Sequence, residues 1–129
     1  MNELPLCRGL HVCESLIVEQ GTKNVTLVNR FNLRRVDEFP SKPLRFVVFA
    51  VLTNGDGAYA ADLVFTHLNS STEIYRHPVE LNFPSPLAEL RFVFRLTECV
   101  FPLSGTYEVS LDIDEGSIAH TQLTIVSEV

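Results

Sequence analysis

The chain has 129 residues, 46% hydrophobic and 20% charged, which is typical of one globular domain with its own core. Sixteen acidic residues against ten lysines and arginines give a formal net charge of −6. This balance disfavours nucleic acid and anionic membranes as partners, because both are bound through clustered cations. We expect a single domain over residues 1–129, with no nucleic acid and no membrane among its partners.

The three cysteines, Cys7, Cys13 and Cys99, are odd in number and show no C-x-x-C spacing. This pattern favours free thiols in a reducing compartment over a disulfide framework. The first twenty residues contain charged positions and lack the apolar core of a secretory signal. We therefore expect a cytoplasmic protein.

The first pair of strands is indicated by two apolar-rich segments around a polar turn. Residues 10–18 predict one strand and residues 25–31 a second. Between them, the six residues from Glu19 to Asn24 include Gly21, and both this glycine and Asn24 tolerate positive φ. We expect the two strands to form an antiparallel hairpin.

A connecting segment follows the predicted hairpin. Residues 34–38 form a mixed charge cluster, and residues 39–43 contain two prolines, which donate no hydrogen bond to a strand ladder. We expect this part of the chain to cross between sheets or over a sheet edge.

The most hydrophobic segment, residues 44–52, is apolar on both faces of a strand, which differs from a sheet strand with one wet face. One face would hold Phe46, Val48, Ala50 and Leu52. The other would hold Val47, Phe49 and Val51. Either the chain covers this second face itself, with its proline-rich connections, or a partner chain does. The second alternative makes Val47, Phe49 and Val51 candidate interface residues.

Further strands are predicted in the second half of the chain, separated by polar turns. They cover residues 59–68, 73–83, 90–96, 107–113 and 117–126. Pro78 indicates that its strand is an edge strand or has a bulge. Seven or eight strands without a long helical period predict an all-β fold, an antiparallel β-sandwich of immunoglobulin-like or C2-like type. A small Greek-key barrel is the alternative.

The last hairpin offers the clearest register, because its first strand alternates strictly. The apolar face of this strand would hold Tyr107, Val109, Leu111 and Ile113. A loop of three residues, 114–116, with Gly116 left-handed in a bulge, keeps that face apolar by pairing Tyr107 with Leu123. A loop of two residues would turn His120 onto it, so we predict the longer loop.

Tyr107 follows Gly105 by two residues, at the start of a late strand. In β-sandwiches a tyrosine at this place often bonds its hydroxyl to backbone across the corner, as a tyrosine corner. The alternative is an amphipathic residue at the core edge with its hydroxyl in water.

The order of these features resembles a known family. The features are the strand around Cys13-Glu14, the hairpin at Gly21, the Phe39-Pro40 break before an apolar strand, and residues 101–107. Together they resemble a family of small uncharacterised bacterial proteins, predicted β-sandwiches classed as a domain of unknown function. The resemblance covers nearly the whole chain and implies the sandwich fold, but no catalytic or binding residue.

Candidate metal ligands lie at two predicted loop ends, where C2-like sandwiches bind calcium with six to eight oxygens. The candidates are Asp112, Asp114, Glu115 and Asp56, with Asn54 and Asp62 nearby. The same residues can equally be solvent-facing strand positions and turn formers.

The histidines and cysteines do not form the pattern of a catalytic or zinc site. The four histidines lie on four predicted strands, without H-x-x-x-H or H-E-x-x-H spacing. His11 and Cys13 share a strand face, but side chains two residues apart are too distant to couple well. No P-loop or G-x-S-x-G is present. We expect no enzyme, no catalytic residue and no cofactor.

The function expected is that of a non-catalytic protein-interaction or assembly module in a bacterial cytoplasm. The partner would be a second copy, giving a homo-oligomer, or a protein encoded by a neighbouring gene. The two-faced strand 44–52 supports this hypothesis. The alternative is a sandwich that binds a sugar or calcium through its end loops, residues 54–57 and 112–116.

Overall fold

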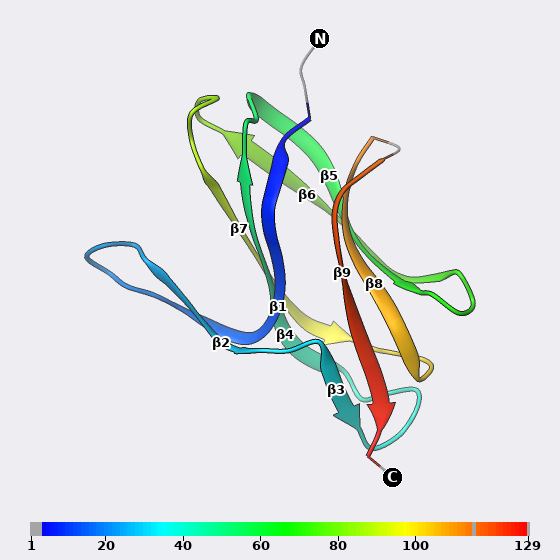
Figure 1. Cartoon of the computed structure of the whole chain (residues 1–129). Coiled ribbons are helices and arrows are strands. Elements are labelled where there is room, and N and C mark those ends of the chain that lie inside the picture. Colours follow the sequence, from blue (N-terminus) through cyan, green and yellow to red (C-terminus); the bar gives the residue numbers. More distant parts are fainter. Residues whose placement is uncertain (1–3, 115, 129) are drawn as a thin grey trace.

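The computed structural model describes residues 4–114 and 116–128, which form nine β-strands and no helix. The strands are β1 Leu6–Val18, β2 Val25–Arg30, β3 Leu33–Val36, β4 Leu44–Thr53, β5 Gly57–His67, β6 Thr72–Phe83, β7 Leu90–Cys99, β8 Gly105–Ile113 and β9 Gly116–Ser127. They make two sheets that pack face to face (Figure 1). Within the described part of the chain, no helix is long and apolar enough to cross a membrane.

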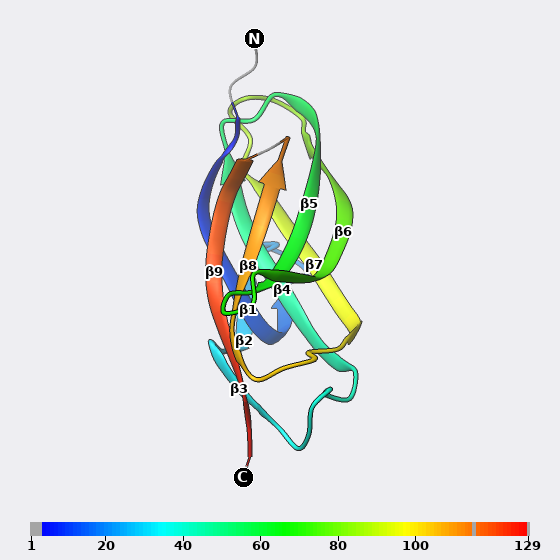
Figure 2. The same ribbon diagram turned by 90° about the vertical axis from the view of Figure 1, so that its right-hand side faces the viewer.

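The sheet topology confirms the predicted β-sandwich. One sheet has the order β2-β1-β4-β7, and the other has the order β3-β9-β8-β5-β6. In Figure 2, β9, β8, β5 and β6 follow one another across the view. Neighbouring strands are antiparallel, except that β3 runs parallel to β9.

The structure has nine strands where seven or eight were predicted. The strand that the sequence did not indicate is β3, because residues 34–38 have a mixed charge pattern. The chain does cross between the sheets here, as expected, but it pairs with β9 on the way, from Leu33 opposite Thr124 to Val36 opposite Ser127. Backbone groups make this ladder, so a strand with charged side chains can complete the sheet edge.

The core lies between the two sheets and contains a cluster of aromatic rings. Phe46 of β4 stacks on Phe101, and Phe65 of β5 lies against both. Tyr107 of β8 meets the Phe101 ring edge-on, with centroids 4.9 Å apart. All four rings are buried, and each contributes about 1.5–3 kcal/mol by leaving water.

The predicted register of the last hairpin is confirmed along most of its length, with Tyr107 opposite Leu123. The turn differs from the prediction. Ile113 pairs with Gly116, so this glycine closes the ladder instead of lying in the loop. A register shift follows Leu111, and Asp114 has a positive φ of 57°, which aspartate tolerates better than most residues. Glu115 lies outside the described residues.

The first hairpin is antiparallel, as predicted, and part of it projects from the sandwich. β1 pairs with β4 only up to Cys13, and from Ser15 onward it pairs with β2 alone. We call residues 14–29 the arm, which extends away from the two layers in Figure 1. Its turn places positive φ at Lys23, and not at Gly21 or Asn24 as expected.

Candidate functional site

The outer face of the four-stranded sheet holds the residues predicted as an interface. Because alternate side chains of a strand point to opposite faces, Val47, Phe49 and Val51 point away from the core. Register places them in three rows across the strands: Arg30, Cys13, Val47 and Arg95; then His11, Phe49 and Val93; then Gly9, Val51 and Arg91. We call these residues, together with the outward-pointing Arg45 of β4, the arginine face.

The single chain already covers the centre of the arginine face. Val47 is 6% exposed and Phe49 7%, while Val51 is half-buried. Register places the long side chain of Arg95 beside Val47 and that of Arg91 beside Val51, and arginine stems can cover apolar surface. Of the two alternatives that the sequence leaves open, the burial of Val47 and Phe49 within the single chain favours internal cover, while Val51 is only half-buried.

The arginine face is positively charged, although the chain as a whole is acidic. Arg30, Arg45, Arg91 and Arg95 are exposed at its margins, and none of the described positions in its rows is acidic. The Arg95 guanidinium has no hydrogen-bond or ion-pair partner among the described residues. Four of the ten cations of the chain thus lie on one sheet surface.

Two of these arginines are held in place by neighbours. Arg30 Nε donates to His11 Nδ1 at 3.0 Å, which requires a neutral acceptor nitrogen on the imidazole. Burial and the positive charge of Arg30 lower the pKa of His11 and so favour this neutral form. Arg91 donates one hydrogen bond to the carboxylate of Glu89, two residues before it in the chain, and another to the backbone carbonyl of Lys23 at the tip of the arm. The arm therefore bends toward the arginine face.

The outer face of the five-stranded sheet has the opposite charge. Its rows are Glu73, Thr66, Glu108 and Gln122; then Arg76, Val64, Ser110 and His120; then Pro78, Asp62, Asp112 and Ser117; then Glu80 and Ala60. We call these residues the acidic face. It carries five carboxylates and one arginine, while its centre, Val64 and Ser110, is uncharged and buried.

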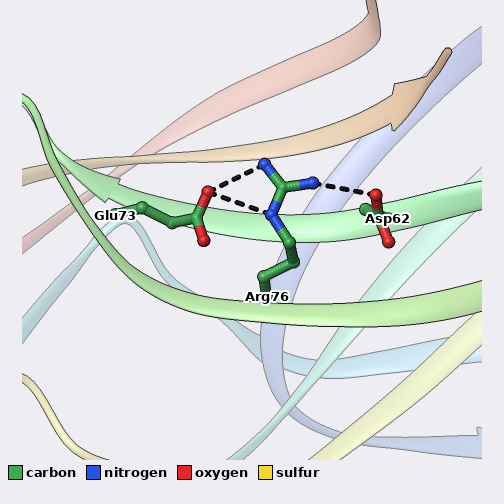
Figure 3. A network of polar contacts seen from close by, with 3 residues as sticks. All are labelled: Asp62, Glu73 and Arg76. Atoms are coloured by element: carbon green, nitrogen blue, oxygen red, sulfur yellow. Dashed lines mark hydrogen bonds and ion pairs between the residues drawn. The ribbon is translucent and has the colours of Figure 1, made fainter. Parts of the chain in front are cut away.

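Arg76 binds two of the five carboxylates of the acidic face (Figure 3). Its guanidinium contacts Asp62 Oδ2 at 2.8 Å and Glu73 Oε1 at 2.7 Å, and these groups lower the energy of the charged arginine, raising its pKa. Exposed ion pairs of this kind add little stability. Among the described residues, Glu80, Glu108 and Asp112 have no cationic partner, and Asp112 Oδ1 is buried without a hydrogen-bond donor.

In the structure, the predicted calcium ligands have different local roles. Asp56 lies in the turn before β5, where its backbone N–H donates to the Tyr59 hydroxyl, and Asn54 has the positive φ of a turn residue. Asp114 lies in the last turn, and Asp112 pairs across the sheet with Asp62. Over residues 4–114 and 116–128, no three His, Cys, Asp or Glu side chains come together as a metal site.

Both ring nitrogens of His67 are hydrogen-bonded, and these bonds stabilise the fold. His67 is buried, with Nδ1 2.7 Å from Ser70 Oγ and Nε2 2.9 Å from the Ser104 carbonyl. Its ring lies 5.0 Å from that of Tyr107. Gly105, at φ 133°, is required here because a Cβ would approach His67 Nε2 to 2.8 Å. The sequence contained no signal for this histidine contact.

The cysteines are free thiols with little nucleophilic character. Cys13 and Cys99 are buried, and Cys7 is half-buried. Burial raises the pKa of all three thiols, that of Cys99 to about 12. Because the thiolate is the reactive form, none of them is prepared for nucleophilic catalysis.

Small hollows lie elsewhere on the surface. One of about 170 Å³ is lined by Arg34, Arg35, Lys42 and nearby acidic side chains. Another, of about 470 Å³, is open and is lined by Tyr59 with Ala58, Ala60, Pro78, Val79 and Glu80. Neither combines an enclosed apolar cavity with converging polar groups, as small-molecule sites usually do.

Comparison with known proteins places this chain in a family. The profile of a family of unknown function, DUF6941, matches residues 9–126. The chain belongs to this family. The DUF6941 match includes every residue of the arginine face and of the acidic face, and it confirms the resemblance to a domain of unknown function. No curated protein matches the chain.

Among solved structures, the chain is similar to an immunoglobulin-like protein from Pseudomonas aeruginosa. The two are 10% identical with a TM-score of 0.48, and the similarity covers 96% of this chain and 98% of the other.

Proposed function

We propose that this member of the DUF6941 family is a non-catalytic protein-interaction module whose arginine face binds an acidic surface of another protein chain. The observation that carries the proposal is the charge of that face. Four arginines surround an apolar centre in a chain with a net charge of −6, and among the described residues the one carboxylate that contacts these arginines is that of Glu89, on Arg91. The three free thiols support a reducing compartment, such as the cytoplasm, as its location.

Arginine is suited to this role. Its planar guanidinium binds a carboxylate through two parallel hydrogen bonds, and such charge-assisted bonds are stronger than neutral ones. Arginine is also enriched among the residues that dominate binding energy at protein interfaces. Arg95 and Arg45 have no side-chain partner within the described residues, so binding a carboxylate does not first require them to break a bond.

The shape of the arginine face favours a protein over a small ligand. It is the surface of a sheet, and its central side chains, Val47 and Phe49, are packed too closely to admit a ligand between them. Small ligands are usually enclosed by concave sites, whereas a protein partner can cover a broad surface.

Binding of a defined acidic probe tests this proposal. The probe is a fluorescent peptide in which glutamate alternates with leucine, titrated by anisotropy at low and high salt. Arg95→Glu should weaken binding at least tenfold, the factor supplied by the roughly 1.5 kcal/mol of one charged hydrogen bond. Lys42→Glu is the matched control, because it makes the same charge change at an exposed lysine outside the arginine face.

Salt should also weaken the binding, because exposed charges are screened over about 8 Å at physiological ionic strength. Equal affinities for the Arg95→Glu and Lys42→Glu proteins would contradict the proposal. So would a peptide affinity that stays constant between 50 and about 500 mM salt, a range over which the Debye length falls severalfold.

A further inference from the structure

The two outer faces of the sandwich carry opposite charges. The arginine face has four arginines, one of which, Arg91, is paired with Glu89, and it has no acidic residue in its described rows. The acidic face has five carboxylates and one arginine, which is already bound to two of them. Because each face is the outside of a different sheet, the two faces point in opposite directions.

Resting on the proposed function above, we propose that the acidic surface bound by the arginine face is the acidic face of a second copy of this chain. Copies would then stack front to back, each presenting its arginine face to one neighbour and its acidic face to the next. This names the partner and the two surfaces that meet.

The two faces match in layout as well as in charge. The middle row of the arginine face, His11, Phe49 and Val93, is uncharged because His11 accepts a hydrogen bond as neutral imidazole. The centre of the acidic face, Val64 and Ser110, is also uncharged. In both faces the charged residues lie around this centre. Stacking one on the other therefore sets uncharged centre against uncharged centre and arginines against carboxylates.

Charge also selects this arrangement over a symmetric dimer. A contact between two arginine faces, or between two acidic faces, would place like charges opposite one another, which costs free energy. Only the contact between unlike faces brings free cations such as Arg95 near free carboxylates such as Glu108. Such a contact is heterologous, so it continues into longer stacks unless the rotation between copies closes a ring.

The arm extends the contact. The backbone carbonyl of Lys23, at the tip of the arm, accepts a hydrogen bond from Arg91, so the arm lies at the rim of the arginine face. Ile17 and Val18 of the arm are 59% and 49% exposed and offer apolar surface to a neighbouring copy. The rows alone span roughly 15 Å across the strands. The contact area that they offer is therefore small, as in weak interfaces. We therefore expect assembly at high protein concentration and low salt.

The test uses two variants, each with one face inactivated. Arg45→Gln with Arg95→Gln removes charge from the arginine face, and Glu80→Gln with Glu108→Gln does so on the acidic face. Sedimentation velocity at several hundred micromolar protein and 50 mM salt should show masses beyond a dimer for the parent. Each variant alone should be a monomer. Their equimolar mixture should form dimers and nothing larger, because only one intact pair of faces remains.

Several outcomes would overturn the inference. The parent could stay monomeric under these conditions, its assembly could persist unchanged in 0.5 M salt, or the mixture could stay monomeric while the parent assembles. The salt series needs no variant, so it decides even if a variant fails to fold by circular dichroism. A monomeric parent that still binds the acidic peptide through Arg95 would overturn this inference and leave the proposed function standing. A parent that fails to bind the peptide would overturn the proposed function.

Discussion

The Tyr107 hydroxyl donates a hydrogen bond to the backbone carbonyl of Leu103, 2.5 Å away and four residues upstream. The same oxygen accepts from the Leu103 N–H at 3.3 Å, so one side chain satisfies both backbone groups of that residue. This is the tyrosine corner that the position of Tyr107 after Gly105 predicted. Together with His67, which binds the Ser104 carbonyl, it holds the connection between β7 and β8 against the core.

Replacing Tyr107 with phenylalanine should destabilise the protein by about 1 kcal/mol or more, because it removes a hydrogen bond and leaves the Leu103 carbonyl unsatisfied. Urea denaturation measures the change, with Leu111→Ala as a comparison that creates a cavity and should cost about 2–5 kcal/mol. A Tyr107→Phe protein as stable as the parent would mean that the corner contributes nothing.

The stability of the protein should fall on acidification below neutral pH, and His11 should contribute to this fall. Burial and Arg30 lower the pKa of His11 in the folded state, so the unfolded chain binds more protons in this range. Stability then rises with pH, and it is lost as pH drops from about 6.5, the pKa of an unfolded histidine, toward the lower folded pKa.

His11→Gln should flatten this part of the pH profile in urea denaturations between pH 5 and 8. His120→Gln is the control, because that histidine is exposed on the acidic face. If the parent and the His11→Gln protein lose stability in parallel, protonation of His11 is not the cause.

Thiol titration should find three cysteines in the unfolded, unreduced protein and should distinguish them in the folded one. Cys7 is half-buried and should react first with a disulfide reagent. Cys13 and Cys99 are buried with raised pKa values, so they should react only as the protein opens. A single thiol in the unfolded protein would reveal a disulfide and argue against a reducing compartment.

Val47→Lys tests the cover of the arginine face. Val47 is buried in the single chain, so the substitution should destabilise the fold by about 1.5–3 kcal/mol, the value of burying such a side chain. Val51→Lys should cost less, because Val51 is only half-buried. Thermal unfolding of both proteins at low concentration measures the difference. A Val47→Lys protein as stable as the parent would show that this side chain is exposed in solution.

Much of this fold could be read from local sequence patterns. The alternation from Tyr107 to Ile113 predicted a half-buried strand, and the need to keep one face apolar predicted its register with β9. These features depend on residues close in sequence, because a side-chain period of two and a short turn together limit how a hairpin can pair. The turn itself was less predictable, since Asp114 takes the positive φ expected of Gly116.

The charge of the outer faces depends instead on the order of strands in each sheet. Arg30 and Arg95 are 65 positions apart in the printed sequence, yet they end the same row because β2, β1, β4 and β7 are neighbours. Asp62 and Asp112 likewise meet only because β5 lies beside β8. The two-faced pattern of β4 indicated that something covers Val47 and Phe49. Packing of the two sheets determines which strands adjoin, and it therefore determined that side chains of the same chain provide this cover.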